Sequence, residues 1–214
     1  STAPEHDDVD LFGANVAYDW GGEKNIMSES YVFVKEVSSD GGTGGVTSTT
    51  VSGESNQDRV ITLGSRVSLE PIERLYLAGE LAMQLGDKYL STTFPNRERR
   101  ALAYQLISQY ALDMKYSPLL KVQFTHYSGD EAPGLSGQIE RGRYEAWDPM
   151  FEDQAGGKLY NALFSATNCN TLMFGVQAVP MDDVTVGLDF TMLWLDETFG
   201  DSSAAPANTM TWTP

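Results

Sequence analysis

Short turns and long polar links alternate from one end of this chain to the other, and this alternation restricts its fold more than any other feature. The short links are residues 20–25, 71–73, 115–118 and 181–183. The long links are residues 38–58, 87–97 and 128–168, and about eight strand candidates lie between the links. An up-and-down transmembrane β-barrel has short turns on one side of the membrane and longer loops on the other. The sequence therefore predicts an all-β, antiparallel up-and-down transmembrane β-barrel.

The strand candidates have the two-residue period of strands whose faces meet different environments. Apolar residues occupy every second position in 9–20, 59–69, 75–85, 101–114, 119–127, 171–179 and 184–195. The segment around 31–35 is ambiguous, because both of its faces carry apolar side chains. These runs span ~9–13 residues, against ~5–6 in a typical soluble strand and the ~9–11 that cross a bilayer. We therefore expect the apolar face to contact lipid, at Leu77, Leu81, Leu106, Val122, Phe124, Val186, Leu188 and Phe190.

The opposite face carries charges and amides. A packed core would not accept such groups without pairing, whereas a water-filled barrel does. Their mixed signs predict weak ion selectivity. The residues expected to line a hydrated lumen are Arg66, Glu80, Gln105, Gln109, Lys121, Gln123 and Asp189.

Composition restricts the partners and the chemistry. The net charge of −16 disfavours binding to nucleic acid, which is itself a polyanion. The acidic residues gather at 5–10, 130–131 and 148–153, where they form solvated loops or, alternatively, bind Ca²⁺ or Mg²⁺. We expect no other cofactor. We also expect that the protein is not an enzyme. Cys169 has only His6 and His126 as possible catalytic partners, and the sequence contains no phosphate-binding, zinc, haem-attachment or dinucleotide motif.

The long link 128–168 is too long for a structureless connection inside a compact domain. We expect it to fold over the barrel mouth, with Trp147 and Phe151 buried and Asp148 beside them. The basic cluster Arg97, Arg99 and Arg100 lies where the preceding link meets a strand. It is either a solvated rim that pairs with acidic loops or, alternatively, a site for an anionic solute or a lipopolysaccharide phosphate. Aromatic residues expected in girdles at the two membrane interfaces are Tyr18, Trp20, Tyr89, Tyr110, Tyr116 and Trp194.

Counting the sides of the strands gives an expectation about the whole protein. If the short turns face the periplasm, both ends of residues 1–214 lie outside the cell, whereas a complete bacterial barrel normally has both ends in the periplasm. The expectation is that 1–214 is one segment of a larger barrel. The rival interpretation is a complete eight-stranded barrel with unusual ends, which would have a nearly filled interior.

Residues 103–164 resemble the C-terminal region of the alginate export family of outer-membrane barrels. The residues that carry the resemblance are Tyr104-Gln105, the turn Tyr116-Ser117-Pro118, the strand 120–127 with Ser128-Gly129-Asp130, and Trp147-Asp148-Pro149-Met150-Phe151. The hairpin at 170–197 also resembles the family's later strands, so that about residues 100–197 are covered. The resemblance implies a large monomeric barrel that passes solutes across the outer membrane. The mixed charges of the expected lumen differ from the strongly basic track that a polyuronate such as alginate requires.

The sequence thus predicts a channel or porin in the outer membrane of a Gram-negative bacterium. Its partners would be outer-membrane lipid and a polar solute or an exported polysaccharide. One alternative is a structural barrel that sheaths or anchors a periplasmic or surface partner protein. A second alternative is a secreted β-sandwich that binds glycans.

Overall fold

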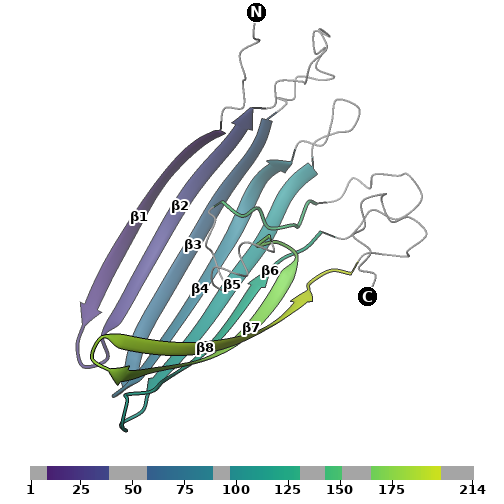
Figure 1. Cartoon of the computed structure of the whole chain (residues 1–214). Coiled ribbons are helices and arrows are strands. Elements are labelled where there is room, and N and C mark those ends of the chain that lie inside the picture. The colour runs from purple at the N-terminus through teal and green to yellow at the C-terminus, as the bar shows by residue number, and fades with distance from the viewer. Residues whose placement is uncertain (1–8, 39–56, 89–96, 131–142, 151–164, 199–214) are drawn as a thin grey trace, which may run out of the picture.

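The computed structural model describes residues 9–38, 57–88, 97–130, 143–150 and 165–198, and its eight strands form one antiparallel sheet (Figure 1). Each strand pairs with the next along the chain, in the order β1 to β8. Among the described residues β1 and β8 remain unpaired edges, so the sheet is open. The strands are β1 Val9–Gly21, β2 Ile26–Ser38, β3 Gln57–Ile72, β4 Leu75–Lys88, β5 Arg97–Ala111, β6 Leu119–Tyr127, β7 Cys169–Met181 and β8 Val184–Leu195.

The all-β, antiparallel, up-and-down order predicted from the alternating links is confirmed. The eight strands form a single sheet, which is not the arrangement of a sandwich of two packed sheets. Closure into a barrel and insertion into a membrane stay predictions. Among the described residues, no helix is long and apolar enough to cross a membrane.

The strand boundaries agree with the sequence prediction at some places and differ at others. β6 and β8 begin and end at the predicted residues. The ambiguous segment near Tyr31 is the middle of the 13-residue strand β2. β5 begins at Arg97 rather than 101, and it ends at Ala111 rather than 114. It ends early because Tyr116 has a φ of 74°, which turns the chain, and because the amide of Leu112 donates to the carbonyl of Pro118 at 2.8 Å.

The short turns are tied to the strands and turns beside them. Asn25, in the first turn, donates to Glu70 near the end of β3 at 2.8 Å. Arg74, in the second turn, forms a 2.8 Å ion pair with Asp113, which follows β5. The hydrogen bond that Arg74 donates to Asp113 raises the pKa of the Arg74 guanidinium above its ordinary value. These bonds connect one hairpin to the next at the short-turn end of the sheet.

The sheet has two faces of opposite character, which we call the inner and outer faces. The inner face is the face on which the segment 143–150 packs, and Figure 1 shows the sheet curved around that segment. The outer face carries apolar side chains on all eight strands. Exposed examples, one from each strand, are Val16, Val32, Leu63, Leu81, Leu106, Val122, Phe174 and Leu188.

The small core of the described structure lies on the inner face, beneath the segment 143–150. Trp147 is 6% exposed and packs near Tyr127, with ring centroids 6.1 Å apart. Ala82, Ala101 and Ala103 occupy neighbouring inner positions on β4 and β5 and belong to the same cluster. Their small side chains leave the space that the indole ring fills.

Candidate functional site

The seven residues predicted to line a lumen all lie on the inner face. They come from β3, β4, β5, β6 and β8, and the register places several of them side by side. Arg66 is opposite Glu80, Glu80 is opposite Gln105, and Gln109 is opposite Lys121. The residues at this position on the five adjacent strands β2 to β6 form what we call the polar row: Glu29, Arg66, Glu80, Gln105 and Thr125.

Within the polar row, the charges are joined by hydrogen bonds and ion pairs. The hydroxyl of Tyr31 donates to Glu80 at 2.5 Å, and Arg66 lies 3.8 Å from the other oxygen of that carboxylate. Asn15 donates to Glu29 at 2.9 Å. At the far end of the row, the amide of Gln105 donates to Thr125 at 3.2 Å.

Tyr31 reaches Glu80 because Gly64 lies between them on β3. A Cβ atom at Gly64 would come within 2.1 Å of the Tyr31 ring. The glycine therefore lets the ring lie flat across the inner face of β3, and the hydroxyl extends to β4. An aromatic ring that covers a glycine on the neighbouring strand is a recurring device of sheets.

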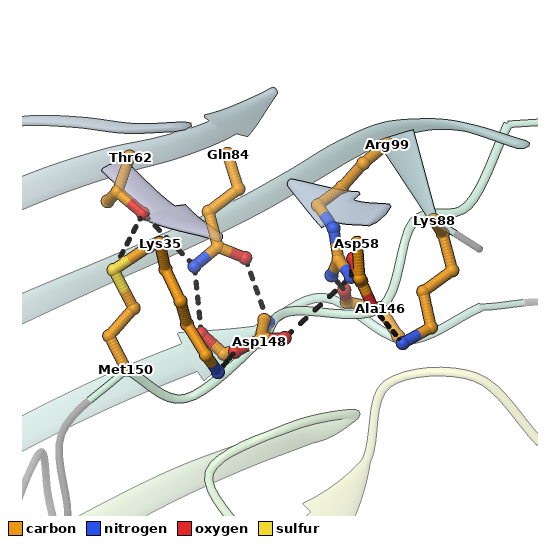
Figure 2. Close-up of polar contacts among 9 residues, drawn as sticks. All are labelled: Lys35, Asp58, Thr62, Gln84, Lys88, Arg99, Ala146, Asp148 and Met150. Carbon is orange, nitrogen blue, oxygen red and sulfur yellow. Dashed lines mark hydrogen bonds and ion pairs between the residues drawn. The ribbon is translucent and has the colours of Figure 1, made fainter. Parts of the chain in front are cut away.

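Beside the polar row, a network of charges fixes the segment 143–150 to the inner face (Figure 2). The guanidinium of Arg99 is 1% exposed and contacts Asp58 at 3.2 Å and Asp148 at 3.7 Å. Lys88 pairs with Asp58, and Lys35 pairs with Asp148 at 2.8 Å. We call these five residues the charge network. Three cations thus enclose two carboxylates, and the pairing offsets part of the cost of desolvating the Arg99 guanidinium.

Gln84 supplies a second attachment, this time to the backbone of the segment. Its amide nitrogen donates to the carbonyl of Asp148 at 2.8 Å, and its amide oxygen accepts from the N–H of Asp148 at 2.8 Å. The same nitrogen contacts the hydroxyl of Thr62 at 3.2 Å. The side chain of Gln84 is fully buried, so these bonds satisfy a polar group that has no access to water.

The segment begins with a single parallel bridge between Tyr144 and Arg99, beside β5. β6 ends at Tyr127, opposite Ala103, which leaves the first residues of β5 without a partner on that side. Tyr144 takes that place, because its N–H donates to Glu98 at 2.8 Å and its carbonyl accepts from Arg100 at 2.9 Å. The chain then crosses the inner face until Met150 contacts the hydroxyl of Thr62 on β3 (Figure 2).

The arginine cluster, predicted to lie where the preceding link meets a strand, lies within the first four residues of β5. Arg97 makes a two-pronged ion pair with Asp130, with N···O distances of 2.8 and 3.1 Å. Arg100 points to the outer face and pairs with Glu98. The prediction of a solvated rim is wrong for Arg99, which is buried in the charge network. The same interpretation also predicted ion pairs with acidic residues of the long links, and Arg97 and Arg99 make such pairs.

Other predicted mouth residues have mixed outcomes. The burial of Trp147 is confirmed, and Asp148 lies next to it in the charge network. Phe151, Tyr89 and the acidic stretch 5–10 lie outside the described residues. In the part of the chain that the structure describes, no group of three or more histidine, cysteine or acidic side chains is arranged to hold a metal ion. Asp130 and Asp148, two carboxylates considered for Ca²⁺, are instead paired with basic residues.

A cavity of about 420 Å³ lies between the polar row and the segment 143–150. Its volume is within the ~300–1,000 Å³ of typical small-molecule sites. The walls combine polar and aromatic groups: Asn15, Glu29, Tyr31, Phe33, Thr62, Arg66, Glu80, Ala82, Ala103, Tyr104, Gln105, Thr125, Tyr127, Trp147 and Met150.

Sequence reasoning missed several residues of this site. Glu29 and Tyr31 were missed because β2 has apolar residues on both faces, which hides its register. Lys35 and Asp58 lie on either side of the long link 38–58, and their partners are 30 or more residues away in the chain. Gln84 carried a usable signal, since it shares its strand parity with Glu80.

No protein-family model matches this chain, and no curated protein matches it in sequence. The resemblance of residues 100–197 to the alginate export family therefore depends on the motifs quoted above and stays a prediction.

Proposed function

We propose that this chain forms the wall of a transmembrane β-barrel in the outer membrane of a Gram-negative bacterium, and that the barrel passes polar solutes. The observation that carries the proposal is the opposite character of the two faces. Large apolar side chains are exposed on the outer face of every strand, while charges and amides occupy the inner face. A soluble protein rarely exposes a continuous apolar surface of this extent, whereas a bilayer stabilises it.

The exposed aromatic residues also support a location in a membrane. Tyr18 and Trp20 lie together at the short-turn end of β1, with ring centroids 4.8 Å apart. Tyr110 lies at the same end of β5, and Trp194 lies at the opposite end of the sheet, on β8. All four are exposed. Such rings are enriched at the two interfaces of a membrane.

The inner face supports a mixed-charge lumen rather than a basic track. Arg66 and Lys121 share that face with Glu29, Glu80 and Asp189. This balance favours weakly selective passage of polar solutes. The likeness to the alginate export family fits transport across the outer membrane, while the carboxylates argue against a polyuronate as the solute.

One observation favours the alternative of a structural barrel that holds a partner. The segment 143–150 crosses the inner face and is fixed there by partly buried polar contacts, which narrows the space beside β2 to β5. A barrel that is blocked in this way would be a sheath or an anchor and would conduct no solute.

Conductance across planar lipid bilayers distinguishes these two functions. The channel predicts that protein purified in detergent produces stepwise ionic currents after reconstitution. Stable insertion into vesicles without any current would favour the structural barrel. A monodisperse folded protein in detergent-free buffer would contradict the membrane location itself.

A further inference from the structure

The cavity on the inner face contains few formal charges, and each has a partner. The charged side chains that line it are Glu29, Arg66 and Glu80. Arg66 and Tyr31 both contact Glu80, and Asn15 contacts Glu29. An anionic ligand would meet two carboxylates and one guanidinium that is already shared. Like charges placed together in a partly dry site are strongly unfavourable.

The same carboxylates suit a ligand that has hydroxyl groups. A carboxylate has about four lone-pair positions, so that each can accept further hydrogens beyond the bonds already described. Gln105 and Asn15 add amide groups to the walls. The cavity therefore offers several hydrogen-bond acceptors and donors without requiring a charged partner.

Aromatic surface lines the cavity from three parts of the chain. Tyr31 and Phe33 come from β2, Tyr127 comes from β6, and Trp147 comes from the segment 143–150. A sugar ring has apolar C–H faces and a rim of hydroxyl groups. Aromatic walls combined with a few placed polar groups match both parts of such a ligand.

We propose that this cavity binds an uncharged sugar unit of an oligosaccharide. The proposal rests on the channel function above, because it names the class of solute that the channel takes. Acidic sugars are disfavoured by Glu29 and Glu80. An amino sugar in its cationic form is attracted by Glu29 and Glu80 and repelled by Arg66, and the cost of desolvating its charge under Trp147 decides against it.

Titration calorimetry on the full chain in detergent micelles tests the proposal with three probes of equal length. The probes are maltotriose, which is neutral, a trigalacturonate, which is acidic, and the trisaccharide of glucosamine, which is cationic at pH 5.5. We expect maltotriose to bind and the two charged probes to bind at least about tenfold more weakly. Tighter binding of either charged probe, or no binding of any of the three, would overturn the proposal.

The variant Glu80→Gln, which keeps the shape of the side chain, tests whether the cavity sets the preference for neutral over acidic sugars. It removes one carboxylate, so the preference for maltotriose over trigalacturonate should fall about threefold or more. The matched control is Asp183→Asn in the turn between β7 and β8, which removes the same charge far from the cavity and should leave the preference unchanged. An equal loss of preference in both variants would mean that net charge alone sets the selectivity, and the cavity would play no part.

Conductance measured on the same preparation separates this proposal from the channel function. Ionic current without binding of maltotriose would overturn the sugar site and leave the channel standing. Binding of maltotriose without current would overturn the channel and leave the site as a glycan-binding surface.

Discussion

Neighbouring residues on a single strand of this protein lie on opposite faces of the sheet. Leu188 on β8 is 77% exposed on the outer face, while the next residue, Asp189, belongs to the inner face opposite Gly175. The Asp189 carboxylate lies over that glycine, where a Cβ atom would come within 2.4 Å of it. The same alternation recurs across the sheet. The effect of a substitution on stability therefore depends more on which face the residue occupies than on its position along the strand.

Leu81→Arg tests the outer face at one residue. Leu81 lies on the outer face of β4 and is 57% exposed. An arginine at the middle of a bilayer costs about 2–4 kcal/mol in the free energy of unfolding. Urea titration in phospholipid vesicles measures this cost. The control is Gln177→Arg on the inner face of β7, which should change stability much less. Equal costs for the two variants would contradict the assignment of the faces.

Gly64→Ala tests the contact between Tyr31 and Glu80. The added methyl group would overlap the ring of Tyr31 and push its hydroxyl away from the carboxylate. Overpacking of this kind costs about 1–3 kcal/mol. Gly79→Ala is the control, because its Cβ atom would meet only Leu106, at an ordinary 3.5 Å. Thermal or urea unfolding in the same detergent compares the two. A cost for Gly79→Ala as large as that for Gly64→Ala would show that only backbone flexibility matters.

At the scale of elements, the segment 143–150 is the part that departs from a simple sheet. It continues the sheet beside β5 and then crosses the inner face. Its side-chain attachments to the inner face include the two hydrogen bonds to Gln84 and the charge network around Arg99. Gln84 and Arg99 are buried, so loss of these contacts should loosen the crossing part of the segment, while the backbone hydrogen bonds between Tyr144 and β5 remain.

Arg99→Met should release this segment. The change leaves Asp58 and Asp148 without their shared cation, although each keeps a lysine partner. We expect a loss of about 2–3 kcal/mol, less than the ~3–5 kcal/mol for a fully buried pair whose partner is removed. If the proposed channel conducts, its single-channel current should also rise, because the segment would no longer narrow the space beside β2 to β5. Unfolding and conductance of the same variant measure both effects.

Arg100→Met is the matched control for that variant. Arg100 lies on the outer side of the same strand, is exposed and pairs with Glu98, a kind of ion pair that contributes about 0–1 kcal/mol. Its loss should leave the current unchanged. A larger current in this control than in Arg99→Met would contradict the anchoring role of the charge network.

The sequence predicts the elements well because period-two alternation is a local signal. β6 and β8 are found to the residue, since polar and apolar positions alternate cleanly in both. β2 is not, because Tyr31 and Phe33 lie over glycines on the inner face while Val32 is on the outer face, and all three are apolar. The start of β5 is missed because Arg97 and Arg99 look like loop residues until their acidic partners are known.

The candidate site is harder to predict, for a physical reason. The alternation of residues along each strand predicts that Arg66, Glu80 and Gln105 share one face, and they do so in the structure. The charge network instead depends on which residues far apart in the chain meet in space. Nothing in the composition of residues 128–168 indicates that Asp148 would contact Arg99 rather than bind a cation.

At the scale of the whole molecule, the proposed channel would take its ion selectivity from the balance of charges on the inner face. Arg66→Gln and Lys121→Gln together remove two positive charges from that face and leave Glu29, Glu80 and Asp189. Selectivity should shift toward cations, because a low-dielectric wall focuses the field of the remaining carboxylates. Reversal potentials in a salt gradient across a planar bilayer measure the shift. An unchanged reversal potential would mean that these residues do not face the conducting path.

Site-directed labelling tests most directly whether the outer face contacts lipid and the inner face contacts water. Cys169, the only cysteine, is replaced by alanine, and a fluorophore is attached at Leu188→Cys or at Asp189→Cys in separate proteins. In vesicles, a quencher carried on the lipid tails should quench the label at 188, and aqueous iodide should quench the label at 189. Quenching of both labels by iodide, with neither affected by the lipid quencher, would contradict the account.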